Sequence, residues 1–574
     1  YGGRATRERR HLLLPVLHEL QDHIGWISRG ALEYACRRLT VPPADAYGVA
    51  SFYARFALEE RPPVAVQVCD DIACKCAGAD DLCALLEKGF GPEGKAGAGG
   101  SAAWYRSPCL GLCDRAPAVL VERAGPAADH ADARIAPAKY EGVSAVLLGA
   151  WPDAEPSLPQ QKERGTVKLL RRVGVVDPES IDSYRQAGGY AALRRAIALG
   201  SDGVIREVTD AKLLGRGGAA FPTGRKWDAL ARAAVHPHHL VCNADESEPG
   251  TFKDRVLMEG DPFAVVEAMT IAAVATGCEQ GYLYVRGEYP LARRRIQHAV
   301  DEARTHGLLG DDIEGAGVRF DIEVRRGAGA YICGEETALF NSIEGKRGEP
   351  RNKPPFPVQA GLFGKPTLVN NVETLVNVLD ILNEGSAAFA KVGTSDSTGT
   401  RLFCMSGCVS TPGLYEIPMG TTLRELIDLA GGLREGRSLR AVLLGGAAGS
   451  FVTAGQLDVP LSFEGTRAIG ATLGSGAVIV LDDTVELEAF LLRIARFFRD
   501  ESCGQCVPCR VGTVRQEEAL KRILSERDKS LRENDIALLS DIAQAMRDAS
   551  ICGLGQTAAN AIGSALIQLK MASA

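Results

Sequence analysis

Apolar residues recur every three to four positions near both ends of the chain, and this spacing predicts helices there. Leu13 and Leu17 carry the pattern within residues 8–58, and Leu487 begins a similar pattern within residues 485–574. We therefore expect a helical region at each end of the chain, with a different organisation between them.

Short apolar runs bounded by turn residues predict strands in the middle of the chain. A helix is predicted over 80–88 and is followed by a glycine-rich loop over 89–100. Helical stretches also separate the later strands, and residues 400–482 are rich in strands with glycine turns. The pattern as a whole predicts a multidomain α/β protein. The predicted strands lie at 64–68, 118–121, 240–242, 281–286, 320–324 and 476–481.

The length of 574 residues is too great for a single hydrophobic core. The polar, proline-containing segment 153–165 is typical of a linker. The changes of pattern predict a helical region at 1–60, a small α/β domain at 61–152, the linker at 153–165, a larger α/β domain at 166–390, a strand-rich domain at 391–482 and a helical domain at 483–574.

The formal net charge of -7 argues against a nucleic-acid-binding protein. No apolar stretch is long enough to span a bilayer, so we expect no direct membrane insertion. The apolar run 12–17 is interrupted by Pro15 and is not followed by a cleavage site of small residues, as a signal peptide would be. We expect a cytoplasmic protein.

Sixteen cysteines are many for a chain without an export signal, and eight of them form two spaced sets. The first set is Cys69-x4-Cys74 with Cys109-x3-Cys113. Two short loops can direct four thiolates toward one point, which suits a [2Fe–2S] cluster or a zinc ion. Zinc sites favour tighter C-x2-C spacing, so the cluster is favoured. Cys76 is a competing ligand nearby.

The second set is Cys503-x2-Cys506-x2-Cys509 with the distant Cys552. Three cysteines at this spacing wrap the backbone around one corner of a cluster, and a fourth ligand from elsewhere completes a [4Fe–4S] site. Zinc remains the alternative. The other cysteines stand singly in apolar surroundings and are expected to be buried as small hydrophobic side chains: Cys36, Cys83, Cys242, Cys278, Cys333, Cys404 and Cys408.

Two glycine-rich segments, 214–224 and 327–336, could surround a phosphate with bare backbone amides. Neither matches G-x-G-x-x-G, so an ordinary Rossmann dehydrogenase is disfavoured. Acidic residues nearby could perform acid–base chemistry on a sugar, bind ribose hydroxyls and a flavin ring, or be solvated. The neighbouring cysteine sets favour the second interpretation. These acidic residues are Asp245, Glu246, Glu248, Glu335 and Glu336.

Longer motifs make the chain resemble two known protein families. Residues 165–574 resemble the flavin subunit of NADH dehydrogenases, and residues 8–150 resemble the thioredoxin-like [2Fe–2S] subunit that partners it. The first resemblance is carried by GRGGAAFPTGRKW, VCNADESEPGTFKDR, VRGEY, GAGAYICGEETAL, KPPFP, GKPTLVNNVET and ESCGQCVPCR. The second is carried by LHELQDHIGWIS, YGVASFYARF and CLGLCDRAP. The chain looks like a fusion of the two subunits. It departs from the flavin-subunit family at Ala220, where glycine is common, and we expect a slight shift in loop packing.

The resemblance implies FMN and a nicotinamide site, in addition to the two clusters. By motif, the FMN-lining residues would be Gly215, Arg216, Gly217, Gly218, Lys226, Asn243, Asp245, Glu246, Tyr331, Gly334, Asn370, Asn371 and Thr374. Phe221, Glu248, Glu336 and Phe356 would face NAD(H), with the aromatic rings on the adenine side, and Glu335 would join the cofactor-binding residues. Glu246, Glu248 and Glu336 would act by positioning the cofactors.

The family resemblance also implies a fold for each segment. It predicts a thioredoxin-like [2Fe–2S] domain after the N-terminal helices, a Rossmann-like FMN/NAD domain, a ubiquitin-like β-grasp domain near 391–482, and a C-terminal helical bundle with the [4Fe–4S] cluster.

A flavin converts the two-electron chemistry of nicotinamide into single electrons for the clusters. Backbone amides and Arg216 would hold the FMN phosphate, and Lys226 could neutralise reduced flavin or the phosphate. The chain has no molybdenum-, nickel- or quinone-site signature, so its electrons must pass to or from another subunit.

The resemblance leaves three kinds of complex open: a molybdenum or tungsten formate dehydrogenase, an NAD-reducing [NiFe] hydrogenase, or respiratory NADH:quinone oxidoreductase. Fusion of the two modules favours the first two. We expect an eroded N-terminal cysteine set in the hydrogenase version, so the intact set favours the alpha subunit of a formate dehydrogenase as partner. The alternative from a different functional class is a scaffold protein that is stabilised by zinc ions and has no redox activity.

Overall fold

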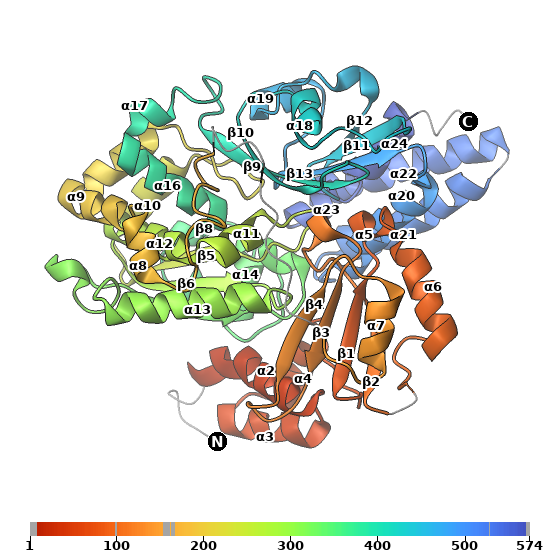
Figure 1. Ribbon diagram of the computed structural model, residues 1–574, viewed down its shortest axis with the longest axis horizontal. Coiled ribbons are helices and arrows are strands. Elements are labelled where there is room, and N and C mark those ends of the chain that lie inside the picture. Colours follow the sequence, from red (N-terminus) through yellow and green to blue (C-terminus); the bar gives the residue numbers. More distant parts are fainter. Residues whose placement is uncertain (1–7, 98–99, 153–160, 162–166, 527, 570–574) are drawn as a thin grey trace.

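The computed structural model describes residues 8–97, 100–152, 161, 167–526 and 528–569. It has three separate β-sheets, a cap of helices at the N-terminal end and a helical bundle at the C-terminal end (Figure 1). The predicted multidomain α/β class is therefore confirmed. Apart from residue 161, the predicted linker lies outside the described residues.

The N-terminal helices lead into a four-stranded sheet of order β2-β1-β3-β4. Strand β1 (Val64–Cys69) is parallel to β2 (Ala102–Ser107) and antiparallel to β3 (Val119–Arg123), which pairs with β4 (Ala131–Ile135). The apolar runs predicted β1 and β3. They missed β2 and β4, the two edge strands, because an edge strand with one solvated face can carry charged residues. The helices of this part are η1 (Glu8–Leu12), α2 (Leu13–Ile24), α3 (Arg29–Leu39), α4 (Pro43–Ala50), α5 (Ile72–Lys75), α6 (Ala79–Phe90), η2 (Cys113–Arg115) and α7 (Tyr140–Leu147).

The central sheet is parallel throughout, with order β7-β6-β5-β8. Helices cover it, and most residues of the inner strands β5 and β6 are buried, whereas the edge strand β7 carries charged residues. Helix α12 (Pro262–Thr276) is apolar on all sides and almost wholly buried. The strands are β5 (His238–Ala244), β6 (Cys278–Val285), β7 (Asp321–Arg326) and β8 (Thr367–Asn371). The helices are α8 (Ile181–Gln186), α9 (Ala191–Asp210), α10 (Thr223–Ala231), α11 (Lys253–Gly260), α13 (Pro290–Thr305), η3 (Ile313–Gly315), η4 (Tyr331–Gly334), α14 (Glu336–Ile343), α15 (Pro357–Ala360), η5 (Leu362–Gly364), α16 (Val372–Glu384) and α17 (Ser386–Phe389).

A five-stranded mixed sheet of order β10-β9-β13-β11-β12 follows, and then the C-terminal helices. In the described part of the chain no helix is long and apolar enough to cross a membrane. The sheet and its helices are β9 (Thr400–Gly407), β10 (Gly413–Pro418), α18 (Leu423–Leu429), β11 (Leu439–Leu444), β12 (Ser450–Val452), η6 (Ala454–Gln456), α19 (Phe463–Ala468) and β13 (Ala477–Asp482). The bundle consists of α20 (Leu487–Asp500), α21 (Val507–Ser525), α22 (Lys529–Ala549), α23 (Gly553–Thr557) and α24 (Asn560–Gln568).

Candidate cofactor and cluster sites

The parallel sheet brings polar side chains together at the carboxyl ends of two neighbouring strands. Asn243 of β5 is in register with Asn371 of β8. The Asn243 amide donates to the Gly334 carbonyl at 2.9 Å, and the Asn371 amide donates to the Asp254 carboxylate at 2.7 Å. Open α/β sheets bind ligands outside the carboxyl ends of their strands, so this edge is the expected place for a cofactor.

The glycine-rich loop before α10 lies against this edge. An antiparallel bridge between Leu214 and Pro222 closes the loop, and the Gly215 N–H donates to the Phe221 carbonyl at 3.0 Å. A Cβ atom at Gly217 would lie 3.1 Å from the Asn371 Cβ, so a side chain there would crowd the sheet edge. Ala220 has φ +53°, a left-handed conformation that glycine adopts without strain. The departure at this position therefore affects backbone strain as well as packing.

Two contiguous cavities lie between the loop and the surrounding domains, with volumes of about 520 and 740 Å³. Gly217, Asn243, Gly334, Glu335 and Asn371 belong to the wall that they share. Every predicted cofactor-binding residue except Arg216 lines at least one cavity. The first cavity also has Gly218, Asp245, Glu246, Glu248 and Tyr331, and the second has Gly215, Phe221, Lys226, Glu336, Phe356, Asn370 and Thr374.

Arg216 is placed differently from the prediction. Its side chain is fully buried, and its guanidinium donates to the carbonyls of Thr398 and Thr400 at 2.7 and 3.2 Å. Only its backbone faces the site, where its N–H donates to the Thr374 hydroxyl at 2.8 Å. Burial lowers the pKa of Arg216 to about 10. The guanidinium therefore lies outside both cavity walls, and the predicted contact with the FMN phosphate does not fit this geometry.

Two adjacent carboxyl groups in the first cavity are strongly desolvated. Glu246 accepts the N–H groups of Asp254 and Arg255, both at 3.0 Å, and burial together with the charge of Asp254 raises its pKa to about 7. Asp245 accepts the Ser247 hydroxyl at 3.2 Å, and burial raises its pKa well above the usual value. Its second oxygen has no hydrogen-bond partner among the described residues, although it is buried. An unpaired buried acceptor at a cavity wall fits a site that binds a donor-bearing ring.

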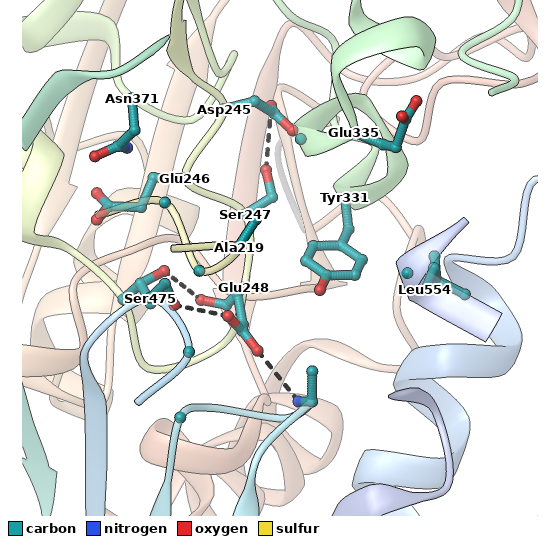
Figure 2. Close-up of a pocket in the computed structure, with 18 of the residues that line it drawn as sticks. Ala219, Asp245, Glu246, Ser247, Glu248, Tyr331, Glu335, Asn371, Ser475 and Leu554 are labelled. Carbon is teal, nitrogen blue, oxygen red and sulfur yellow. Dashed lines mark hydrogen bonds between the residues drawn. The ribbon is translucent and has the colours of Figure 1, made fainter. Parts of the chain in front are cut away.

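Glu248 ties the first cavity to the five-stranded domain. Its carboxylate accepts the Ser475 hydroxyl at 2.6 Å and the Ala448 N–H at 3.1 Å, and Figure 2 shows this carboxylate facing Ser475. Burial raises the pKa of Glu248. Two residues far along the chain thus fix the orientation of this glutamate.

Glu335 and Glu336 share one cation. The Lys353 ammonium lies 2.9 Å from Glu335 and 2.7 Å from Glu336. Glu335 also caps α14 by accepting the N–H groups of Thr337 and Ala338. Glu336 lines only the second cavity, so the structure does not gather the three predicted positioning glutamates at one point.

Lys253 is a cavity residue that motif reasoning missed. Its ammonium is buried and contacts Asp254 at 2.8 Å, Asn371 at 3.1 Å and Glu373 at 3.1 Å. These carboxylates raise the pKa of Lys253 despite its burial. This lysine could have been suspected, because it lies within one of the motifs that carry the family resemblance.

Other residues that line the first cavity could not have been suspected, because they come from distant domains. They are Gly445, Ala448, Thr472, Gly474, Ser475, Gly553, Leu554, Thr557 and Asn560.

The first cysteine set converges as its spacing predicted. Cys69 ends β1, Cys74 lies in α5 and Cys113 begins η2, and all four thiols are at most 3% exposed. The Cys109 and Cys113 sulfurs are 3.4 Å apart, and the Cys69 thiol is hydrogen-bonded with Cys74 and Cys109. Hydrogen bonds from Cys113 and Cys69 lower the pKa of Cys109. This buried thiol group fits a [2Fe–2S] cluster.

Cys76, the competing ligand, is directed elsewhere. Its thiol is hydrogen-bonded with Cys408, which follows β9 in the five-stranded domain. The geometry therefore favours Cys69, Cys74, Cys109 and Cys113 as the ligand set.

The second set surrounds the start of α21. Cys506 is the N-cap of this helix, Cys509 lies in its first turn, and Cys552 caps α23. Cys552 also lines the second cavity, so the predicted [4Fe–4S] site borders the cofactor space. The C-x2-C-x2-C spacing of the set is the one expected for a [4Fe–4S] cluster.

Two buried arginines join the [2Fe–2S] loop to the cofactor cavity. Arg286 donates to the Cys109 carbonyl and to the Glu246 carbonyl, both at 2.6 Å. Arg255 donates to the Gly111 carbonyl at 2.9 Å and pairs with Asp114 at 2.8 Å. The loop is therefore held by the same segment that lines the first cavity.

Comparisons with known proteins agree with this division of sites. Residues 3–135 match the thioredoxin-like [2Fe-2S] ferredoxin family, 208–380 the Nuo51 FMN-binding domain, 402–448 the SLBB domain, and 489–571 the NADH-ubiquinone oxidoreductase-F iron-sulfur binding region. The F 2 subunit of NADH-quinone oxidoreductase in Rhizobium meliloti is 46% identical over 400 residues, covering 69% of this chain and 94% of that protein. The chain belongs to the family of NADH-quinone oxidoreductase F subunits.

Other relatives of this F-family chain extend the comparison. The HndC subunit of the NADP-reducing hydrogenase of Solidesulfovibrio fructosivorans is 45% identical over 397 residues, covering 68% of this chain and 79% of that protein. A chain in the crystal structure of an H2-reduced NAD+-reducing [NiFe]-hydrogenase is 33% identical with a TM-score of 0.83, covering 98% of this chain and 93% of that one. The F-family chain is thus an NAD-dependent oxidoreductase subunit whose domains bind FMN, [2Fe–2S] and [4Fe–4S], and the zinc alternative has no support.

Removing an aromatic ring from the second cavity should weaken NADH binding. Phe356 lines this cavity and is 52% exposed, as expected for a ring that a nucleotide would cover. We expect Phe356→Ala to raise the KM for NADH about tenfold with little change in kcat, because stacking on a base is worth ~1–3 kcal/mol and the adenine is remote from the reacting ring. Steady-state NADH–dye assays would measure this. Phe363→Ala, at an exposed ring outside both cavities, is the control, and an equal KM for the two variants would contradict the prediction.

Proposed function

We propose that the chain is the NAD⁺-reducing subunit of a metal-dependent formate dehydrogenase. In this role it exchanges hydride with nicotinamide at one end and single electrons with a partner subunit at the other. One observation carries the redox part of the proposal: the second of the two contiguous cavities is lined both by exposed aromatic rings and by Cys552 of the [4Fe–4S] set.

FMN would lie against the wall that the cavities share. Asn243, Asn371 and the bare backbone at Gly217 offer polar contacts there. The Lys253 ammonium lies beside them, already paired with Asp254 and Glu373. When bound there, FMN would supply the conversion between hydride and single electrons that the clusters require.

NAD(H) would enter beside the rings of Phe221 and Phe356, and Glu336 with Lys353 would contact its riboses. Glu248 is held rigidly by Ser475 and Ala448, so it can orient a nicotinamide without moving. Hydride transfer needs no acid–base residue, and the glutamates act by placement.

Electrons would leave through the [4Fe–4S] site. Tyr331 lines the first cavity, and its N–H donates to Glu501 at 2.8 Å, two residues before Cys503. Arg286 connects Glu246 with the [2Fe–2S] site, because it donates to the carbonyls of both Glu246 and Cys109. The [2Fe–2S] cluster would serve as an electron store or as a second branch of the electron path.

The partner is proposed from the intact first cysteine set together with the fusion of both modules in one chain. A formate dehydrogenase alpha subunit would remove two electrons from formate, and the F-family chain would deliver them to NAD⁺. An NAD-reducing [NiFe] hydrogenase is the second candidate, favoured by the hydrogenase chain that matches 98% of this chain.

An assay on the anaerobically purified native complex tests the proposal. Formate and hydrogen would be added separately, and NAD⁺ reduction would be followed at the nicotinamide absorbance. Formate-driven NADH supports the proposal, whereas hydrogen-driven NADH assigns the chain to a hydrogenase. NADH–dye activity without either donor points to a respiratory partner, and loss of the dye reaction as well would overturn the redox role.

A further inference from the structure

A helix of the [4Fe–4S] domain reaches the loop that carries the first two [2Fe–2S] cysteines. Helix α20 packs against α5, and the Arg493 side chain of α20 is only 10% exposed. Its guanidinium lies 3.2 Å from the Asp71 carboxylate and 3.5 Å from the Asp70 carboxylate. It also donates to the Asp70 carbonyl at 3.4 Å. One arginine therefore contacts the two residues that directly follow Cys69.

Asp71 extends this contact to a third ligand. The same carboxylate oxygen that faces Arg493 accepts the Cys109 N–H at 3.2 Å, and the other oxygen accepts the Ile72 N–H at 2.8 Å. Asp71 is 1% exposed, so water cannot replace these partners. The Cys109 peptide is thus held at its amide through Arg493 and Asp71, and at its carbonyl by Arg286.

We infer that Arg493 is a positioning residue for the [2Fe–2S] site, supplied by the domain that carries the other cluster. This inference rests on the [2Fe–2S] site of the proposed function and on its assignment to Cys69, Cys74, Cys109 and Cys113. Arg493 orients Asp71 and thereby fixes the Cys109 backbone. Its charge also stabilises the reduced cluster, which carries one more electron, because charge and hydrogen bonding around the sulfurs set cluster potentials.

A purely structural role for Arg493 makes a different prediction. An ion pair that only joins two domains would change stability and leave the cluster potential unmoved. The potential and the EPR g-values of the [2Fe–2S] cluster therefore discriminate between the two roles.

The test is an EPR-monitored redox titration of the full chain at pH 8. We expect Arg493→Gln to shift the equilibrium of the [2Fe–2S] couple about tenfold toward the oxidised form, which is a fall of about 59 mV for one electron. Arg493→Lys keeps the charge and should recover most of the shift. The matched control is Arg496→Gln, at an exposed arginine on the same helix, and it should behave as wild type. A potential and g-values in Arg493→Gln equal to those of Arg496→Gln would overturn the inference.

Asp71→Asn keeps the inference testable if Arg493→Gln does not fold. Asparagine still offers an oxygen to the Cys109 N–H but removes a negative charge, so the potential should rise; a fall or no change would contradict the inference. Flavin content and the [4Fe–4S] signal of each sample report whether the fold is intact. Cys113→Ser should lose the [2Fe–2S] signal, and its survival would mean that the ligand assignment is wrong, independently of Arg493.

Discussion

Replacing Cys509 with serine is expected to separate NADH oxidation from electron delivery to the partner subunit. Cys509 is 5% exposed in the first turn of α21, and its loss removes one of four thiolates from the [4Fe–4S] site. Partner-linked NADH turnover should fall about 100-fold or more, since even outer-shell changes at metal sites cost ~10–100-fold. NADH–dye activity should persist, because a small dye can take electrons at the flavin without the cluster.

Both activities would be measured on the same anaerobic preparation, with iron content and the [4Fe–4S] EPR signal determined alongside. Cys36→Ser is the control, at a cysteine of α3 that is 3% exposed and outside both sets. Partner-linked turnover at the wild-type rate in Cys509→Ser would refute the assignment of this cysteine. Equal loss of the two activities would show that the cluster does not lie downstream of the flavin.

The second large effect is expected on stability. Arg255 is fully buried and pairs with Asp114 at 2.8 Å and Glu259 at 3.1 Å. Arg255→Met removes a positive charge from beside the buried carboxylates of Asp114 and Glu259. Breaking a buried ion pair in this way costs about 3–5 kcal/mol of folding stability. The same change releases the Gly111 carbonyl, so the [2Fe–2S] loop should also loosen.

Thermal unfolding followed by calorimetry would measure this loss, with the [2Fe–2S] EPR signal recorded before heating. Arg294→Met is the matched control, because Arg294 pairs with Asp132 while its side chain is 47% exposed. An exposed pair of this kind is worth about 0–1 kcal/mol. If the two variants unfold at the same temperature, the buried network does not carry the stability assigned to it.

The sequence motifs predicted which residues line the cofactor cavities better than they predicted side-chain direction. Asn243 and Asn371 were predicted because each lies in a motif that resembles the flavin-subunit family, and the structure places both at the edge where the parallel strands β5 and β8 end. Arg216 could not, because a motif records its neighbours in sequence and the guanidinium turns toward Thr398 and Thr400, far along the chain. Local spacing also predicted both cysteine sets, since three ligands of the second set fall within a few residues.

Contributions from other domains escaped sequence reasoning for a physical reason. Ser475 and Ala448 have ordinary side chains in a strand-rich region, and only the packing of the five-stranded sheet brings them to Glu248. Arg493 likewise belongs to a regular amphipathic helix. Such residues acquire a role through tertiary contact, which no local pattern encodes.

The enclosure of the [2Fe–2S] loop determines the order in which the protein can mature. All four thiols are at most 3% exposed, and arginines from two other domains close over the loop. An assembly protein that delivers iron and sulfide has no open route to thiols that are buried in this way. We therefore expect the N-terminal domain to receive its cluster before it docks, and a lost cluster to be replaced only after the domains separate.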